Sequence, residues 1–163
     1  MTRMDNRQIE TFDISIPREM TCRLLGIRPG PRPPRETTLL LIEQGLAMAA
    51  ELVDARAVMR FSHAGLPGSS HLPTASPLVA VVCTIGPALE ARVAALASAG
   101  DSARALVLDA VGSSAAEEVA DAADRLICRL AAPTDMVPRA RRSPGYGDWD
   151  LEEQRALFRY LEP

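Results

Sequence analysis

The sequence predicts an α+β fold in which a small, mainly antiparallel sheet is covered by long helices within a single domain. Segments with the apolar spacing of helices are long, whereas apolar runs of strand length are few. These runs do not alternate with helices as a clean βαβ series, which argues against a doubly wound parallel sheet. A length of 163 residues fits one domain over 1–163 and is long enough to bury a core, and no internal repeat is visible.

Proline and glycine mark the expected breaks, and serine and aspartate mark the helix starts. In the first half we expect an extended segment at 1–14, a helix from a Ser15 cap to about Leu25, a proline-rich linker at 26–34, a helix from Pro34 to about Asp54 and a strand at 55–63. In the second half we expect a loop at 64–77, a strand at 77–86, a helix ending at Gly100, a long helix from an Asp101 cap to about Leu130, a loop at 141–149 and a last helix after Asp150.

Three of these elements carry detailed expectations. The run PLVAVVCTIG is continuously apolar and β-branched, which predicts a buried central strand. Glu153 lies three residues after Asp150, which predicts a capping box at the last helix. Helical spacing predicts that the buried face of the 34–54 helix holds Leu40, Leu41, Gln44, Met48 and Leu52.

Composition excludes several classes of function. A net charge of −3 and an aromatic content of 4% provide neither a basic field for nucleic acid or anionic lipid nor a platform for stacked bases. The three cysteines are an odd number without a C-x-x-C pair, which indicates a reducing compartment, and Cys83 is expected to be a small core residue. No apolar run is long enough to span a bilayer, and no histidine has a metal-ligand partner at ligand spacing. We therefore expect a cytoplasmic protein whose partners are small molecules or proteins.

The stretch RRSPGYGDW, residues 141–149, is the most specific motif of the chain. Pro144 fixes φ at the second position of a type II turn, and Gly145 supplies the positive φ of the third. Two arginines can pair with a carboxylate, and Tyr146 and Trp149 offer faces for a planar ring. These features fit a ligand with an acid group and an aromatic base. The alternative is a loop packed on the core by its aromatics, with its arginines in solvent.

The 101–130 helix has two sides. Its core face is predicted to hold Leu108, Val111, Ala115, Val119, Ala122 and Leu126. Another side gathers Asp109, Ser113, Glu117, Asp121 and Asp124. Gly112 in mid-helix costs about 1 kcal/mol relative to alanine and suggests close approach of another backbone or a ligand. The acids could hold a cation, or the face could be a solvated one on a tightly packed helix.

Residues 83–121 together with 141–158 resemble the activation domain of cobalamin-dependent methionine synthase, in its stand-alone form. The resemblance extends over about residues 17–163, and its most specific part is the arginine-x-x-Pro-Gly-Tyr pattern. In that family this loop binds S-adenosylmethionine. The resemblance implies that Arg141 binds the ligand's carboxylate and that Pro144, Gly145 and Tyr146 shape its adenosyl side. It also implies that an acid of the long helix, Asp121 or alternatively Glu117, contacts the ligand.

The implied function is that of an S-adenosylmethionine-binding subunit for reductive reactivation, by remethylation, of a cobalamin-dependent methyltransferase such as methionine synthase. The chain lacks the corrinoid-binding pattern D-x-H-x-x-G, so cobalamin is expected on a partner chain. Methyl transfer to that partner requires an open site, which we expect as a shallow cleft between the 102–130 helix and the 141–149 loop. Family members continue with a further strand and loop, so the resemblance implies a domain that lacks them. The second hypothesis is a non-catalytic interaction protein that docks on a corrinoid protein without binding the ligand.

Overall fold

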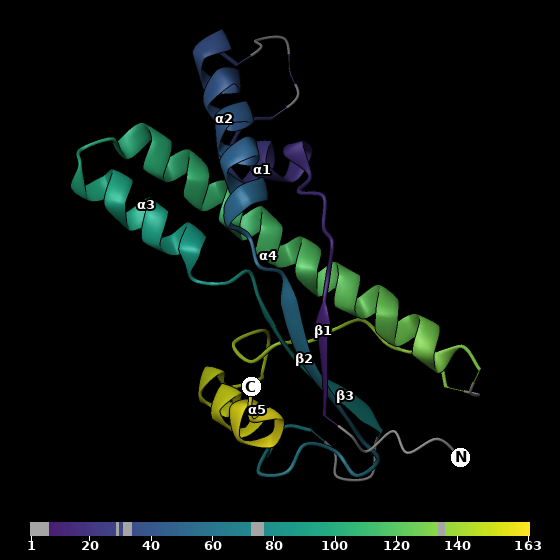
Figure 1. The fold of residues 1–163 in the computed structure, drawn as a ribbon. Helices are drawn as coiled ribbons and strands as arrows, with labels where there is room; N and C mark the ends of the chain where they lie inside the picture. Colours follow the sequence, from purple (N-terminus) through teal and green to yellow (C-terminus); the bar gives the residue numbers. More distant parts are fainter. Residues whose placement is uncertain (1–6, 29, 31–33, 73–76, 134–135) are drawn as a thin grey trace. The chain divides into compact units, whose positions relative to one another are not determined.

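The computed structural model describes residues 7–28, 30, 34–72, 77–133 and 136–163, and it has the predicted α+β fold (Figure 1). Its elements in order are β1 (Gln8–Thr11), α1 (Arg18–Leu24), α2 (Glu36–Leu52), β2 (Arg56–Ser62), β3 (Leu78–Thr84), α3 (Ala88–Ser98), α4 (Ser102–Ala131), the 3-10 turn η1 (Leu151–Glu153) and α5 (Gln154–Leu161). Residues 29 and 31–33 of the predicted linker and 73–76 of the predicted loop lie outside the described residues. Within the described ranges, no helix has both the length and the apolarity to cross a bilayer.

The chain forms two compact units, each assembled from segments that are far apart in the sequence. The sheet unit comprises Met1–Thr11, Ala57–Cys83 and Asp121–Pro163, and the helical unit comprises Phe12–Arg56 and Thr84–Ala120. Because the segments of the two units alternate along the chain, neither unit is a consecutive domain of the usual kind. The expectation of a single domain over 1–163 stays a prediction.

The sheet has the order β1-β2-β3 and is antiparallel. The prediction that the 77–86 run forms a central strand is therefore wrong, because β2 occupies the centre and β3 an edge. The burial of β3 agrees with an edge position, since only Ala80 is fully buried and most of its other side chains are half-buried. A continuous apolar run indicates burial on both faces, but it does not reveal how many strands flank it.

The core of the sheet unit is formed by Leu66, Ala80, Trp149, Ala156 and Leu161, with Tyr160 packed against it. Hydrogen bonds attach the C-terminal helix α5 to this core. The Tyr160 hydroxyl donates to the Phe61 carbonyl at 2.9 Å, and Arg60 donates to the Tyr160 carbonyl at 3.0 Å. The loop at 141–149 thus leads into a segment that is fixed on the sheet.

The helical unit depends on glycines at its helix contacts. A Cβ added at Gly112 of α4 would stand 2.6 Å from Leu89 Cδ2 of α3, and one at Gly45 of α2 would stand 3.3 Å from Val107 and Val111. Contacts under 3 Å cannot be accommodated without movement, and Leu89 is fully buried. The mid-helix Gly112 is therefore explained by tight helix packing rather than by the approach of a ligand.

The predicted buried face of α2 is wrong in part, because Leu41, Met48 and Leu52 are half-buried and none of the five predicted residues is fully buried. The buried positions of this helix are Ile42, Gly45 and Ala49, whereas Leu40 is 57% exposed and Gln44 is exposed. Two of the three buried positions, Gly45 and Ala49, are small residues, and a pattern of large apolar side chains does not reveal them.

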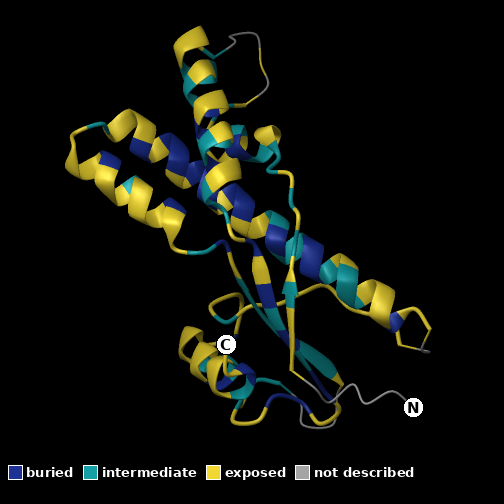
Figure 2. Cartoon of the chain, viewed as in Figure 1, coloured by how far each residue is buried: buried dark blue, intermediate teal, exposed yellow. Residues whose placement is uncertain are grey.

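The predicted core face of α4 is confirmed, with Leu108, Val111, Ala115, Val119 and Ala122 buried and Leu126 half-buried (Figure 2). The Asp101 cap is also confirmed, because its carboxylate accepts the Arg104 amide hydrogen at 3.3 Å. The predicted Ser15 cap is wrong. Pro17, in an extended conformation, stands at the N-cap of α1, and its carbonyl accepts the first helical amide hydrogens.

Candidate functional site

The loop at 143–149 begins with the predicted turn. The Tyr146 amide donates to the Ser143 carbonyl at 3.2 Å, and Gly145 has a φ of 91°, as the third position of a type II turn requires. A Cβ at Gly145 would also lie 3.2 Å from Leu151 Cδ1. The prediction of a positive φ at Gly145 after Pro144 is confirmed.

A second turn closes the loop on itself. The Trp149 amide donates to the Tyr146 carbonyl at 3.2 Å, and Gly147 has a φ of 63°. The Gly145 amide donates to the Trp149 carbonyl at 2.7 Å. Because the amides of Gly145 and Tyr146 are used inside the loop, their hydrogens do not point outward to a ligand. Contacts with a ligand would therefore come from side chains, such as the Tyr146 ring and Arg141, rather than from these two amides.

Arg141 and Asp121 of α4, which were assigned separately to one ligand, form an ion pair with each other. The two side chains are 43% and 48% exposed, so both can be reached from solvent. Glu117, the alternative acid, is exposed on α4 one turn earlier and takes part in an interaction of its own. The structure thus brings together the predicted residues Arg141 and Asp121 within the sheet unit.

Cys83 of β3 lies within the electrostatic influence of Arg141. Burial raises the pKa of the Cys83 thiol, and the positive charge of Arg141 partly opposes this rise. The thiol is half-buried and is kept in its neutral form, which agrees with the expected role as a small apolar residue. Arg141 therefore forms an ion pair with Asp121 of α4, and its charge also acts on Cys83 of β3.

The two aromatic residues of the motif have different environments. Tyr146 is 73% exposed, so its ring can serve as a face for a planar group. Trp149 is 5% exposed and its ring is stacked on that of His71, with centroids 5.4 Å apart and an interplanar angle of 14°. The expectation that Trp149 offers a face to a ligand is therefore wrong, because this side chain belongs to the core.

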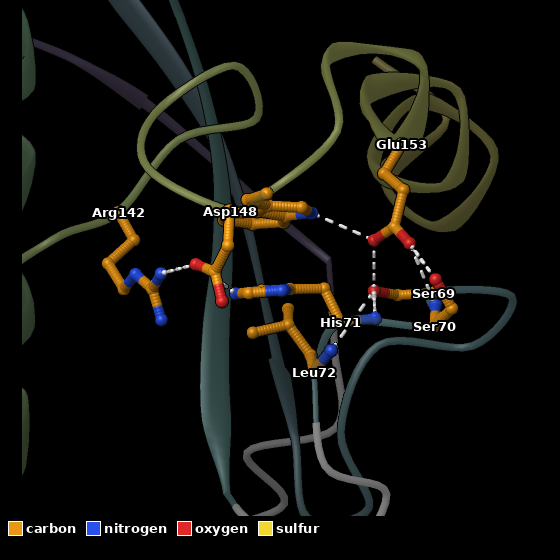
Figure 3. Close-up of polar contacts among 8 residues, drawn as sticks. Ser69, Ser70, His71, Leu72, Arg142, Asp148 and Glu153 are labelled. Atoms are coloured by element: carbon orange, nitrogen blue, oxygen red, sulfur yellow. Dashed lines mark hydrogen bonds and ion pairs between the residues drawn. The ribbon is translucent and has the colours of Figure 1, made fainter.

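Glu153 joins the motif to the loop after β2 (Figure 3). Its carboxylate accepts hydrogen bonds from the Ser69 hydroxyl at 2.5 Å, the Ser70 hydroxyl at 2.5 Å, the Ser70 amide at 2.9 Å and Trp149 Nε1 at 2.8 Å. The bonds from Ser69 and then Ser70 are the largest causes that lower the pKa of Glu153 to about 2. The predicted capping box is wrong, because Asp150 caps η1 alone and Glu153 is directed at the serines.

The sequence did not predict this cluster of donors around the Glu153 carboxylate. Ser69 and Glu153 are 84 residues apart, and no local spacing connects them. The adjacent serines in a Pro-Gly-rich loop were the one available sign, because such hydroxyls often accept or donate locally. In the cluster, Ser69 Oγ also accepts the amide hydrogens of His71 and Leu72 at 3.2 Å each.

Arg142 is engaged by a neighbour of its own. It donates to Asp148 Oδ1 at 3.1 Å, and the same oxygen lies 3.8 Å from His71 Nε2 (Figure 3). The pKa of Asp148 is lowered, first by a hydrogen bond from its own backbone amide and then by the charges of His71 and Arg142. Of the two arginines, Arg142 therefore stabilises the loop, whereas Arg141 is paired with a helix carboxylate outside it.

The part of the chain that the structure describes contains no group of three or more His, Cys, Asp or Glu residues that could hold a metal ion. What the sheet unit does offer is an exposed arginine–aspartate pair and an exposed tyrosine on a rigid turn. The arginine–aspartate pair offers one cationic and one anionic partner, which suits the two charged groups of a zwitterion. Comparison of the sequence with models of known protein families and with curated proteins finds no match.

Proposed function

We propose that this protein is an S-adenosylmethionine-binding subunit that serves the reductive reactivation of a cobalamin-dependent methyltransferase, with methionine synthase as the methyltransferase that the motif resemblance suggests. The observation that carries the proposal is the ion pair of Arg141 with Asp121 beside the Ser143–Tyr146 turn. The protein acts in the cytoplasm as a component of the methyltransferase system, not as a complete enzyme. Its partner is the methyltransferase or another corrinoid protein, and nucleic acid and membranes have no part in its role.

The charges of the pair suit the two charged groups of an amino-acid ligand. The Arg141 guanidinium can bind the ligand's carboxylate, and the Asp121 carboxylate can bind its ammonium group. An ion pair this exposed contributes only about 0–1 kcal/mol, whereas each charge-assisted hydrogen bond contributes about 1.5–3 kcal/mol. Binding would therefore replace this exposed protein ion pair with two charge-assisted contacts to the ligand.

The remaining roles are divided between this chain and its partner. Tyr146 offers its exposed ring to the adenine, and the turn at Pro144 and Gly145 fixes the backbone that carries this side chain. The ligand supplies the methyl group, while cobalamin and the external electron enter through other proteins. The expected cleft between the long helix and the loop stays a prediction, because the methyl group must remain open to the partner.

The second candidate is an interaction protein that keeps the fold but does not bind S-adenosylmethionine. Two observations favour it. The amides of Gly145 and Tyr146 bond within the loop, and Trp149 is buried in the core. A loop so fully bonded internally could serve as a rigid docking element.

Isothermal calorimetry with S-adenosylmethionine separates the two candidates. We expect the wild type to bind and Arg141→Ala to bind more weakly by about 1.5–3 kcal/mol, the range of a charge-assisted hydrogen bond. Asp121→Asn should weaken binding as well. Arg139→Ala is the matched control, since it removes the same charge from an exposed position of the same segment.

The outcomes are distinct. Equal affinities for Arg141→Ala and Arg139→Ala would remove Arg141 from the site. No heat of binding for the wild type, from a folded sample, would overturn the ligand proposal in favour of the interaction protein.

A further inference from the structure

A hollow of about 270 Å³ lies in the helical unit between the end of α1 and one face of α4. Its lining residues are Leu24, Leu25, Leu106, Asp109, Ala110 and Ser113. The four residues from α4 are spaced i, i+3, i+4 and i+7, so they form one stripe along the helix. This stripe includes the first part of the acidic side of α4, which the proposed ligand site does not use.

The apolar walls of the hollow are open to solvent. Leu24 is 49% exposed and Leu106 is 64% exposed, although both are large apolar side chains. Leu24 is the last residue of α1, where the amides of Gly26 and Ile27 donate back to the carbonyls of Arg23 and Cys22 and so end the helix in a Schellman motif. The backbone at Leu24 is thus fixed by the end of α1.

A carboxylate stands among these leucines. Asp109 is exposed. Within the described residues its carboxylate forms no ion pair and accepts no hydrogen bond. Ser113 follows one turn later on the same stripe and offers a hydroxyl group. The lining of the hollow therefore combines apolar side chains with one carboxylate and one hydroxyl group.

We propose that this hollow binds the side chain of an arginine presented by a partner protein. An arginine has an apolar stem, which suits the leucines, and a planar cation whose fork of donors can bind Asp109 in bidentate fashion. Its further donors can reach the Ser113 hydroxyl, which the point charge of lysine cannot do at the same time. The volume lies below the range of about 300–1,000 Å³ for drug-sized ligands, and it suits a single side chain. Arginine is also among the residues most enriched at the energetic centres of interfaces.

The proposal does not depend on S-adenosylmethionine binding. Its residues belong to the helical unit, whereas Arg141, Asp121 and Tyr146 belong to the sheet unit. Failure of either proposal would therefore leave the other standing.

The test is a titration of the isotopically labelled full chain, followed by the backbone amide signals in NMR spectra. The probe is Nα-acetyl-arginine methylamide, with the citrulline analogue as its neutral, isosteric counterpart and the lysine analogue as the point charge. We expect the arginine probe to shift the signals of Leu24, Leu106, Asp109 and Ser113 saturably. The citrulline probe should bind at least about tenfold more weakly, since it loses a charge-assisted contact.

Variants provide the second arm. Asp109→Asn should reduce the affinity for the arginine probe about tenfold or more, and Glu51→Gln, with the same change of charge at an exposed position of α2, should leave it unchanged. Because both positions are exposed, both variants should retain the wild-type spectrum elsewhere. Equal binding of the arginine and citrulline probes, or shifts that do not saturate, would overturn the proposal, and tighter binding of the lysine probe would overturn the choice of arginine.

Discussion

Arg141 interacts with both Asp121 and Cys83, so the presence of its charge can be measured at the Cys83 thiol. It forms an ion pair with Asp121, and its charge opposes the rise in the pKa of Cys83 that burial causes. Any change that removes or neutralises the guanidinium should therefore be reported by the thiol. Cys83 can serve as a reporter because a thiolate reacts and a thiol does not.

We expect Arg141→Ala to raise the pKa of Cys83 further, because the lowering influence is lost while burial remains. The measurement is the pH dependence of alkylation of Cys83, with Cys22 and Cys128 changed to serine. At a fixed pH below this pKa, alkylation should be slower in Arg141→Ala than in the parent protein. Arg139→Ala should leave the profile in place, and an unchanged profile in Arg141→Ala would show that Arg141 does not act on the thiol.

The helices and strands show which features local sequence determines. The Asp101 cap, the glycine breaks after α1 and α3 and the core face of α4 were all predicted, because each depends on residues within a few positions of one another. The edge position of β3 and the buried face of α2 were not, because they depend on segments distant in sequence. In the candidate site, the Pro-Gly pair predicted the positive φ of Gly145. The assignment of Arg141 and Asp121 to the same ligand came from the resemblance alone. The burial of Trp149 agrees with the alternative interpretation, in which the loop packs on the core by its aromatics, whereas the serine contacts of Glu153 were not predicted.

The Glu153 cluster joins η1 to the loop after β2, and it should make the stability of the sheet unit depend on pH. The pKa of Glu153 is lowered from 4.5 to about 2 in the folded chain. Because the folded pKa is depressed, the carboxylate contributes its full stabilisation above about pH 4.5, and this contribution is lost as the pH falls toward 2. Protonation removes charge-assisted acceptors from Ser69, Ser70 and Trp149.

We expect Glu153→Gln to be less stable than the wild type at pH 7 and the difference to shrink steadily below about pH 4.5. The midpoint of urea unfolding, followed by the fluorescence of Trp149, measures the stability of the wild type and of Glu153→Gln at each pH. Glu152→Gln is the matched control, because it removes a carboxylate from the adjacent, exposed position. A constant difference between Glu153→Gln and the wild type from pH 7 to pH 3 would contradict the role of the ionised carboxylate.

On the proposed function, this protein presents S-adenosylmethionine and its partner carries cobalamin. Remethylation of an oxidised corrinoid protein in the presence of S-adenosylmethionine and a reductant should therefore require this protein. The measurement is the absorbance change of the corrinoid on methylation. Arg141→Ala should slow the reaction at subsaturating ligand, and Arg139→Ala should not. Equal rates with and without the chain would exclude the activation role, and the interaction-protein candidate would then stand.

The segments of the two units alternate along the chain, so the ribosome finishes one unit before the other. All segments of the helical unit have been made once Ala120 is added, whereas the sheet unit waits for Leu161. At about 5–20 residues per second, the 41 residues from Asp121 to Leu161 take roughly 2–8 s. During that interval Leu66 and Ala80 have been made, but Trp149, Ala156 and Leu161, which later pack in the same core, have not. We therefore expect the helical unit to fold first, because all of its segments are made earlier.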